Sequence, residues 1–183
     1  MGDQSLKYLG NPNPKFTLGW GNTIQIRNFT IDFLFTGNFG GKVMSYTQSI
    51  LDGLGVSKAT ADARNAGTVK VNAEYADGSK FSGPIDPKAF YQGVGGQSGI
   101  GEYYMYDATN FRLQELSIGY KIPLKNSCIS DLRIALVGKD LFLIKKAPFD
   151  PAVSMATGNA LQGVDTFGQP ATRSIGVSVK VGF

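Results

Sequence analysis

Five stretches of this chain alternate large apolar side chains with small or polar ones, and each stretch runs for about ten residues or more. Alternation with a period of two puts one kind of side chain on each face of a β-strand. The last stretch is the most regular, because its apolar set is Ile175, Val177, Val179, Val181 and Phe183 and its intervening set is Ser174, Gly176, Ser178, Lys180 and Gly182. The pattern predicts strands with one apolar face.

The spacing of these strands predicts how they are joined. We place them near residues 15-26, 29-36, 110-122, 130-143 and 172-183. Short turns are expected at 27-28 and 123-130, and long loops at 37-101 and 144-171. Transmembrane barrels alternate short periplasmic turns with long extracellular loops in this way, and their tilted strands have this length. We therefore expect an all-β antiparallel meander over residues 1-183, with minor α-structure in a long loop, forming the last five or so strands of a transmembrane β-barrel.

Soluble sandwiches and barrels also contain alternating strands, so the prediction of a membrane barrel needs separate evidence. The apolar faces carry almost no charge along whole strands, and the opposite faces carry glycine, serine, threonine, glutamine and aspartate instead of a second set of core residues. Aromatic residues also sit near strand ends, as the interfacial girdles of membrane barrels require. These features favour the membrane barrel.

Local breaks in the pattern predict irregularities. The alternation changes parity between Leu113 and Leu116, which predicts a bulge near Glu115, and a second change of register is expected around Gly138. Spaced apolar residues between 43 and 66 predict one or two short helices, and residues 68 to 75 predict a small strand.

Composition argues against catalysis and against nucleic-acid binding. The 183 residues include no histidine, which removes the usual general base and the commonest metal ligand, and one cysteine, Cys128, which removes any intramolecular disulfide. No pair of acids has a glycosidase-like spacing. The net charge is +4, but the lysines and arginines are scattered. We expect no enzyme activity, no catalytic residue, no cofactor, no metal and no nucleic-acid partner. The first residues do not resemble a signal peptide, so we expect any export signal to lie outside this sequence.

Several segments, in order, resemble the C-terminal region of SusC/RagA-type TonB-dependent outer-membrane proteins. They are LGNPNPKF at 9–16, NFTIDF at 28–33, GNFGGKV at 37–43, NFRLQELSIGY at 110–120, GKDLF at 138–142, DP at 150–151, and the terminal stretch from Pro170 and Arg173 to Phe183. The chain departs from the family pattern at Asp140, where asparagine is usual, and at Ala152, where glutamate is common.

The resemblance implies a function. It implies a fragment of an importer of oligosaccharides or peptides in the outer membrane of a Gram-negative, Bacteroidetes-like bacterium, without an enzyme activity of its own. The full-length protein would have 22 strands, a plug and a TonB box. Its partners would be a SusD-like lipoprotein and TonB, bound through missing regions, with a glycan or peptide as solute. The alternative is a stand-alone soluble β-domain with a binding or structural role.

Two further features are candidates for specific roles. Tyr103, Tyr104 and Tyr106 lie beside a glycine-rich loop and are candidate ligand contacts, since exposed aromatic rings can stack on sugars; the alternative is an interfacial girdle. Phe183 ends the chain, and the resemblance implies that it acts as a C-terminal signal for insertion into the membrane.

Overall fold

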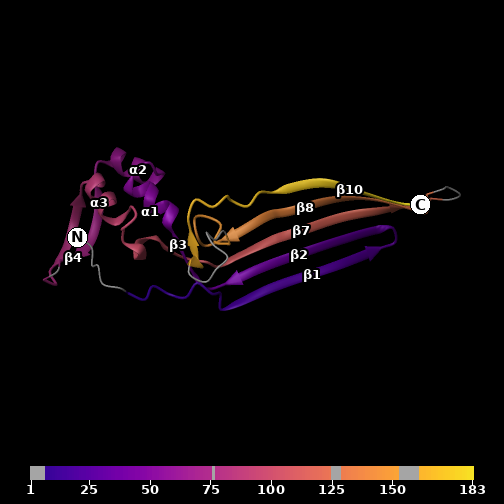
Figure 1. The fold of residues 1–183 in the computed structure, drawn as a ribbon, viewed down its shortest axis with the longest axis horizontal. Helices are drawn as coiled ribbons and strands as arrows, with labels where there is room; N and C mark the ends of the chain where they lie inside the picture. The colour runs from indigo at the N-terminus through magenta and orange to yellow at the C-terminus, as the bar shows by residue number, and fades with distance from the viewer. Residues whose placement is uncertain (1–6, 76, 125–128, 153–160) are drawn as a thin grey trace. The chain divides into compact units, whose positions relative to one another are not determined.

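The computed structural model describes residues 7–75, 77–124, 129–152 and 161–183. Its largest element is a five-stranded antiparallel sheet in which the strands follow one another in sequence order (Figure 1). The strands are β1 (Phe16–Ile26), β2 (Phe29–Phe39), β7 (Asn110–Ile122), β8 (Asp131–Lys145) and β10 (Ser174–Gly182). The predicted antiparallel meander is confirmed.

The register of this sheet collects the apolar side chains on one face. One cross-strand row contains an apolar residue from every strand, namely Ile24, Ile31, Ile118, Leu136 and Val177. The neighbouring row contains Thr23, Asp32, Ser117, Val137 and Gly176. Because successive side chains point to opposite faces, the first row and every second row from it lie on the same face, and together they form one continuous apolar face.

Both predicted irregularities are present. The pairing of β7 shifts on both sides, between Leu34 and Phe35 of β2 and between Leu113 and Glu115 of β7 itself. On β8 the same shift lies between Lys139 and Phe142, and Asp140 there has a left-handed backbone with φ of 49°. The bulge restores the apolar face after the change of parity seen in the sequence.

The connections differ between the two ends of the sheet. β1 turns into β2 through Arg27 and Asn28, and Arg27 has a positive φ of 54°. The β7–β8 connection is at this same end and is described only in part; Cys128 lies outside the described residues. The long segments between β2 and β7 and between β8 and β10 leave from the opposite end, where Asn38 pairs with Asn110 and Asn110 pairs with Lys145.

The chain divides into two compact units, whereas the sequence pattern predicts a single segment over residues 1-183. Unit 2 comprises residues 11–42, 107–153 and 169–183 and contains the five-stranded sheet. Unit 1 comprises residues 1–10, 43–106 and 154–168. Most of the loop predicted at 37-101 therefore belongs to a folded unit.

Unit 1 is built from short elements with clear start and stop signals. The helices are α1 (Tyr46–Gly53), α2 (Lys58–Ala66) and α3 (Pro87–Val94), followed by the 3-10 helix η1 (Gly101–Tyr104). Ser45, Ser57 and Asp86 cap the three α-helices by accepting a backbone N–H with their side chains. The helices predicted between residues 43 and 66 are thus present as α1 and α2. None of the described helices is long and apolar enough to cross a membrane.

The remaining strands of unit 1 form two small sheets. β4 (Val69–Glu74) and β5 (Lys80–Ile85) make an antiparallel hairpin. β3 (Lys42–Ser45) lies between β6 (Met105–Asp107) and β9 (Val164–Asp165), and its pairing with β9 is parallel. The packing around α1 is tight, because a Cβ built on Gly53 would lie 2.5 Å from the backbone nitrogen of Gly96.

Candidate functional site

The apolar face of the five-stranded sheet is exposed over most of its area. Trp20 on β1 is 54% exposed, and Val177 on β10 is 70% exposed. No charged side chain occupies a paired position on this face in the five described strands. A contiguous apolar surface of this extent marks a surface that meets a membrane or another protein. Its exposed members are Phe16, Leu18, Trp20, Ile24, Ile26, Phe29, Ile118, Tyr120, Ile134, Leu136, Ile144, Ile175, Val177, Val179 and Val181.

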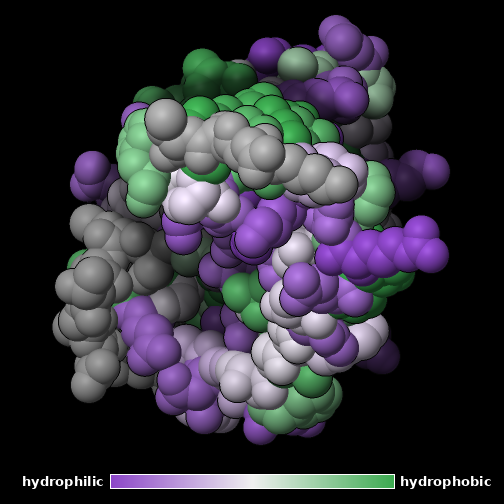
Figure 2. All heavy atoms as spheres, turned by 90° about the vertical axis from the view of Figure 1, so that its right-hand side faces the viewer, coloured by the Kyte–Doolittle hydropathy of each residue, from purple (hydrophilic) through white to green (hydrophobic). Residues whose placement is uncertain are grey.

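Aromatic pairs lie near both ends of this face. Phe29 packs on Tyr120 at the short-turn end, with ring centroids 4.6 Å apart. Phe16 stacks on Phe39 at the opposite end, also at 4.6 Å. Rings at both margins of an apolar band are the arrangement found in the interfacial girdles of membrane barrels. Viewed from the short-turn end, hydrophobic side chains gather along the top and hydrophilic ones lie beneath them (Figure 2).

The opposite face of the sheet is polar and carries paired charges. Thr23 donates a hydrogen bond to Asp32 at 2.7 Å across β1 and β2. Lys121 lies 3.0 Å from Asp131 across β7 and β8. Gly19 on β1 leaves open space on this face, since a Cβ there would meet no atom within 4 Å. A face of this kind can line a water-filled interior.

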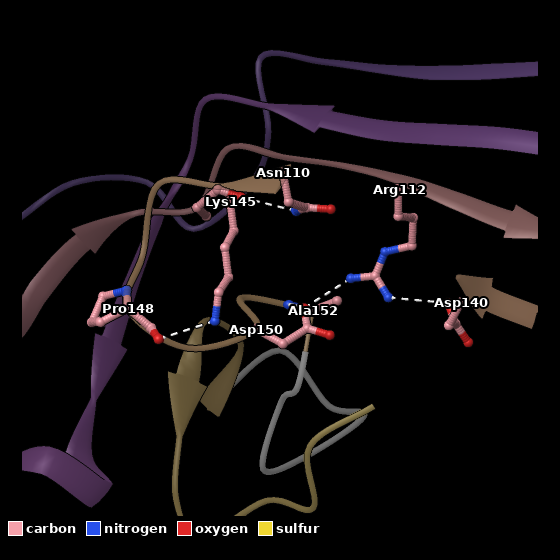
Figure 3. Close-up of polar contacts among 8 residues, drawn as sticks. Asn110, Arg112, Asp140, Lys145, Pro148, Asp150 and Ala152 are labelled. Carbon is pink, nitrogen blue, oxygen red and sulfur yellow. Dashed lines mark hydrogen bonds and ion pairs between the residues drawn. The ribbon is translucent and has the colours of Figure 1, made fainter. Parts of the chain in front are cut away.

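An ion cluster fixes the segment after β8 to the polar face near the long-connection end (Figure 3). The Arg112 guanidinium lies 2.8 Å from the Asp150 carboxylate and 3.6 Å from that of Asp140. The Ala152 N–H donates to the same Asp150 oxygen at 3.0 Å, and the Lys145 ammonium donates to the Pro148 carbonyl at 3.0 Å. The Arg112 and Asp150 side chains are only 14% and 7% exposed. Asp140 and Asp150 stood out in the sequence as motif residues, but their shared contact with Arg112 was not foreseen.

The structure distributes the three candidate tyrosines over different environments. Tyr104 is fully buried, and its hydroxyl donates to the Asp52 carboxylate at 3.1 Å. Its ring is therefore a core element of unit 1 and is closed to an outside ligand. Tyr103 is 49% exposed and packs edge-on against Phe90. Tyr106 is half-buried. The role of these residues in ligand contact stays a prediction, and only Tyr103 has a largely open ring.

The protonation of these tyrosines follows from their surroundings. Burial raises the pKa of Tyr104 far above its usual range, and the nearby negative charge of Asp52 adds to the effect. Burial and the same carboxylate also raise the pKa of Tyr103 and of Tyr106. All three hydroxyls are therefore neutral hydrogen-bond donors at physiological pH.

Comparisons with known proteins find a curated protein and a solved structure that are similar to this chain. No family model matches the chain. A TonB-dependent receptor, P3, from Formosa agariphila is 26% identical over 187 aligned residues, covering 97% of this chain and 17% of that protein. The predicted resemblance to SusC/RagA-type TonB-dependent receptors is confirmed. The structure of the RagAB peptide transporter shares the fold, with a TM-score of 0.60 and 17% identity over 91% of this chain.

The chain spans 17% of the length of both of these proteins. In the described structure the five strands do not close into a barrel, because β1 and β10 each pair with one neighbour only. Phe183 follows the last strand and is 92% exposed. Its role as an insertion signal stays a prediction.

Proposed function

We propose that this chain forms part of the barrel wall and extracellular loops of a TonB-dependent outer-membrane importer of oligosaccharides or peptides. The observation that carries the proposal is the single apolar face that runs across all five strands, from Ile24 on β1 to Val177 on β10. This face would contact lipid, and the polar face with Asp32 and Arg112 would line the interior. Strands of 9 to 15 residues are long enough to cross the hydrocarbon core at a tilt.

The connections supply the orientation. The short-turn end would face the periplasm, and the segments between β2 and β7 and between β8 and β10 would face the cell exterior. The similarity to a receptor from Formosa agariphila supports a Gram-negative outer membrane. TonB would supply energy, and a SusD-like lipoprotein would share the work of capturing solute, both through regions beyond this chain. The chain itself would perform no chemistry on the solute.

A matched pair of lysine substitutions on β10 tests the membrane-facing surface. Val177→Lys places a charge on the apolar face, and Ser178→Lys places the same charge on the polar face one residue away. In lipid vesicles, Val177→Lys should destabilise the folded state by about 2–4 kcal/mol, while Ser178→Lys should change it by less than about 1 kcal/mol. The measurement is the folded fraction in a urea titration, read from heat-modifiable migration on a gel.

Two outcomes would contradict the proposal. Equal effects of the two lysines would mean that both faces meet similar surroundings. A chain that stays folded and monomeric in water without detergent, with both variants tolerated, would favour the soluble β-domain instead.

A further inference from the structure

Three basic residues stand side by side on the polar face of the five-stranded sheet, near its short-turn end. Arg133 on β8 is paired with Lys121 on β7 and with Lys180 on β10, so the three form one cross-strand row. Neighbouring strands are only about 4.8 Å apart, and like charges directly opposite one another destabilise a sheet. The row therefore carries an electrostatic cost that a bound anion would remove.

One carboxylate beside the row offsets part of its charge. Asp131 begins β8 on the same face as Arg133, and its carboxylate lies 3.0 Å from the Lys121 ammonium. No other aspartate or glutamate of the five described strands is paired with a member of the row. Three positive charges thus face one negative charge, and the two on Arg133 and Lys180 remain uncompensated.

Arg133 and Lys180 keep hydrogen-bond donors for an outside acceptor. Among the described residues, neither side chain takes part in an ion pair. The Arg133 Nε is buried and meets no hydrogen-bond acceptor in the described part of the chain. Lys180 is exposed, and it lies on β10 at the edge of the described sheet. A guanidinium has five N–H donors and an ammonium has three, so both groups can bind an anion that approaches from the polar face.

Short side chains beside the row leave room for that anion. The next row on the polar face consists of Thr30, Gly119, Ala135 and Ser178, none of which is charged or bulky. A Cβ built on Gly119 would lie 3.8 Å from the Arg133 Cδ, so the stem of Arg133 lies beside this glycine. The cations therefore border a low, uncharged area of the sheet surface.

The number and spacing of the free charges select the class of anion. Arg133 and Lys180 are on adjacent strands, so a single tetrahedral oxyanion can contact both. Arginine binds two oxygens of a phosphate with its planar fork, and lysine binds phosphate as a point charge. A phosphate monoester carries nearly two negative charges at neutral pH, whereas a carboxylate carries one. A phosphoryl group would compensate both cations, and a carboxylate would leave one uncompensated.

We propose that Arg133 and Lys180 form a binding site for the phosphoryl group of a small phosphate monoester, with the Lys121–Asp131 ion pair at its side. The site lies on the face that would line the barrel interior, so its use in import rests on the proposed function and would add a phosphorylated solute to it. Binding can be measured without transport or membrane insertion. A failure of this site and a failure of the import function would therefore be separate results.

The test is isothermal titration calorimetry on the full chain in detergent at low salt, with methyl phosphate and methyl sulfate as probes. Both are tetrahedral, but at about pH 7.5 methyl phosphate carries nearly two negative charges and methyl sulfate carries one. Methyl phosphate should bind at least about fivefold more tightly. At about pH 5 it becomes a monoanion, and its advantage should disappear because lysine and arginine keep their charge.

Variants assign the binding to the two cations. Arg133→Gln and Lys180→Gln should each weaken methyl phosphate at least about fivefold, because each removes a charged donor. Lys139→Gln is the matched control, since Lys139 lies on the same strand and face but pairs with Glu115, and it should change the affinity less than about twofold. Asp131→Asn should tighten binding about twofold or more, because it removes the negative charge beside the site.

Three results would each overturn the inference. They are equal affinities for methyl phosphate and methyl sulfate at about pH 7.5, equal effects of Arg133→Gln and Lys139→Gln, and tighter binding of an acidic peptide, N-acetyl-triglutamyl amide, than of methyl phosphate. The last result would identify an acidic polypeptide as the occupant. Thermal unfolding of each variant separates a lost contact from a lost fold. If Arg133→Gln unfolds, the exposed Lys180→Gln and the gain expected from Asp131→Asn decide.

Discussion

Replacing Arg112 by methionine should strongly destabilise unit 2. The substitution keeps much of the aliphatic stem and removes the guanidinium that lies 2.8 Å from Asp150 and 3.6 Å from Asp140. The Asp150 side chain, 7% exposed, would keep the hydrogen bond from the Ala152 N–H but would lose its cationic partner. Removing one partner of a buried pair costs about 3–5 kcal/mol, and because Arg112 is partly exposed we expect about 3 kcal/mol.

The assay is urea unfolding in detergent micelles, followed by the fluorescence of Trp20. This is the only tryptophan in the chain, and it lies on β1 within the same unit, packed at 5.2 Å against Phe33. With a urea slope of about 1–3 kcal/mol/M, the midpoint should fall by about 1–3 M. The double variant with Asp150→Asn should lose less than the sum of the single variants, because the unpaired charge is gone.

Lys121→Met is the matched control, since it breaks the ion pair with Asp131 on the same polar face. That pair is 52% and 31% exposed, and exposed pairs contribute about 0–1 kcal/mol. Two results would contradict this reasoning. One is an Arg112→Met variant that loses no more stability than Lys121→Met, and the other is an effect of Arg112→Met that adds fully to that of Asp150→Asn. Either would show that the ion pair with Asp150 does not hold the segment after β8 on the sheet.

Two other predictions concern packing and pH. Gly53→Ala should destabilise unit 1 by about 2 kcal/mol or more, because its Cβ would lie 2.5 Å from backbone, whereas Gly19→Ala, in open space on β1, should be nearly neutral in thermal unfolding. The hydrogen bonds from Thr109 and the nearby Lys146 ammonium lower the pKa of Asp107 from 3.8 to about 2. This lowered pKa stabilises the fold above about pH 4, and that stabilisation is lost as the pH falls toward 2. Asp107 is partly exposed, so the loss should be about 1 kcal/mol; a stability-versus-pH curve unchanged by Asp107→Asn would contradict this.

The sheet could be predicted from the sequence because strand alternation is a local property. The faces of β10 follow from nine consecutive residues, and the bulge in β7 follows from a parity change between Leu113 and Leu116. Each inference needs only neighbouring residues and the period of two. The caps of α1 and α2 are equally local, because Ser45 and Ser57 each bond a backbone N–H three residues later.

The ion cluster and the tyrosine environments could not be predicted in this way. Arg112 and Asp150 are 38 residues apart in the sequence, and the paired residues of β3 and β9 are 120 apart. Both contacts therefore depend on the path that a long connecting segment takes back to the earlier strand. The sequence predicts a single aromatic cluster, because the three tyrosines are close together in the chain. The 3-10 helix that ends at Tyr104 turns adjacent rings in different directions, which buries Tyr104 and leaves Tyr103 half exposed.

Hydrogen bonds at the two ends of the insertion at residues 43–106 explain how β2 and β7 can pair regularly on either side of it. The Gly40 N–H donates to the Thr109 hydroxyl and the Ala108 N–H donates to the Gly41 carbonyl, so two hydrogen bonds within unit 2 join the two sides of the insertion. The entropic cost of closing a loop grows only with the logarithm of its length, by about 0.6 kcal/mol for each doubling. Pairing of β2 with β7 therefore needs little from the content of residues 43–106. It follows that Gly53→Ala should destabilise unit 1 while the free energy of unfolding measured by Trp20 fluorescence stays the same. A change of more than about 1 kcal/mol in that free energy would show that the stability of the sheet depends on the inserted unit.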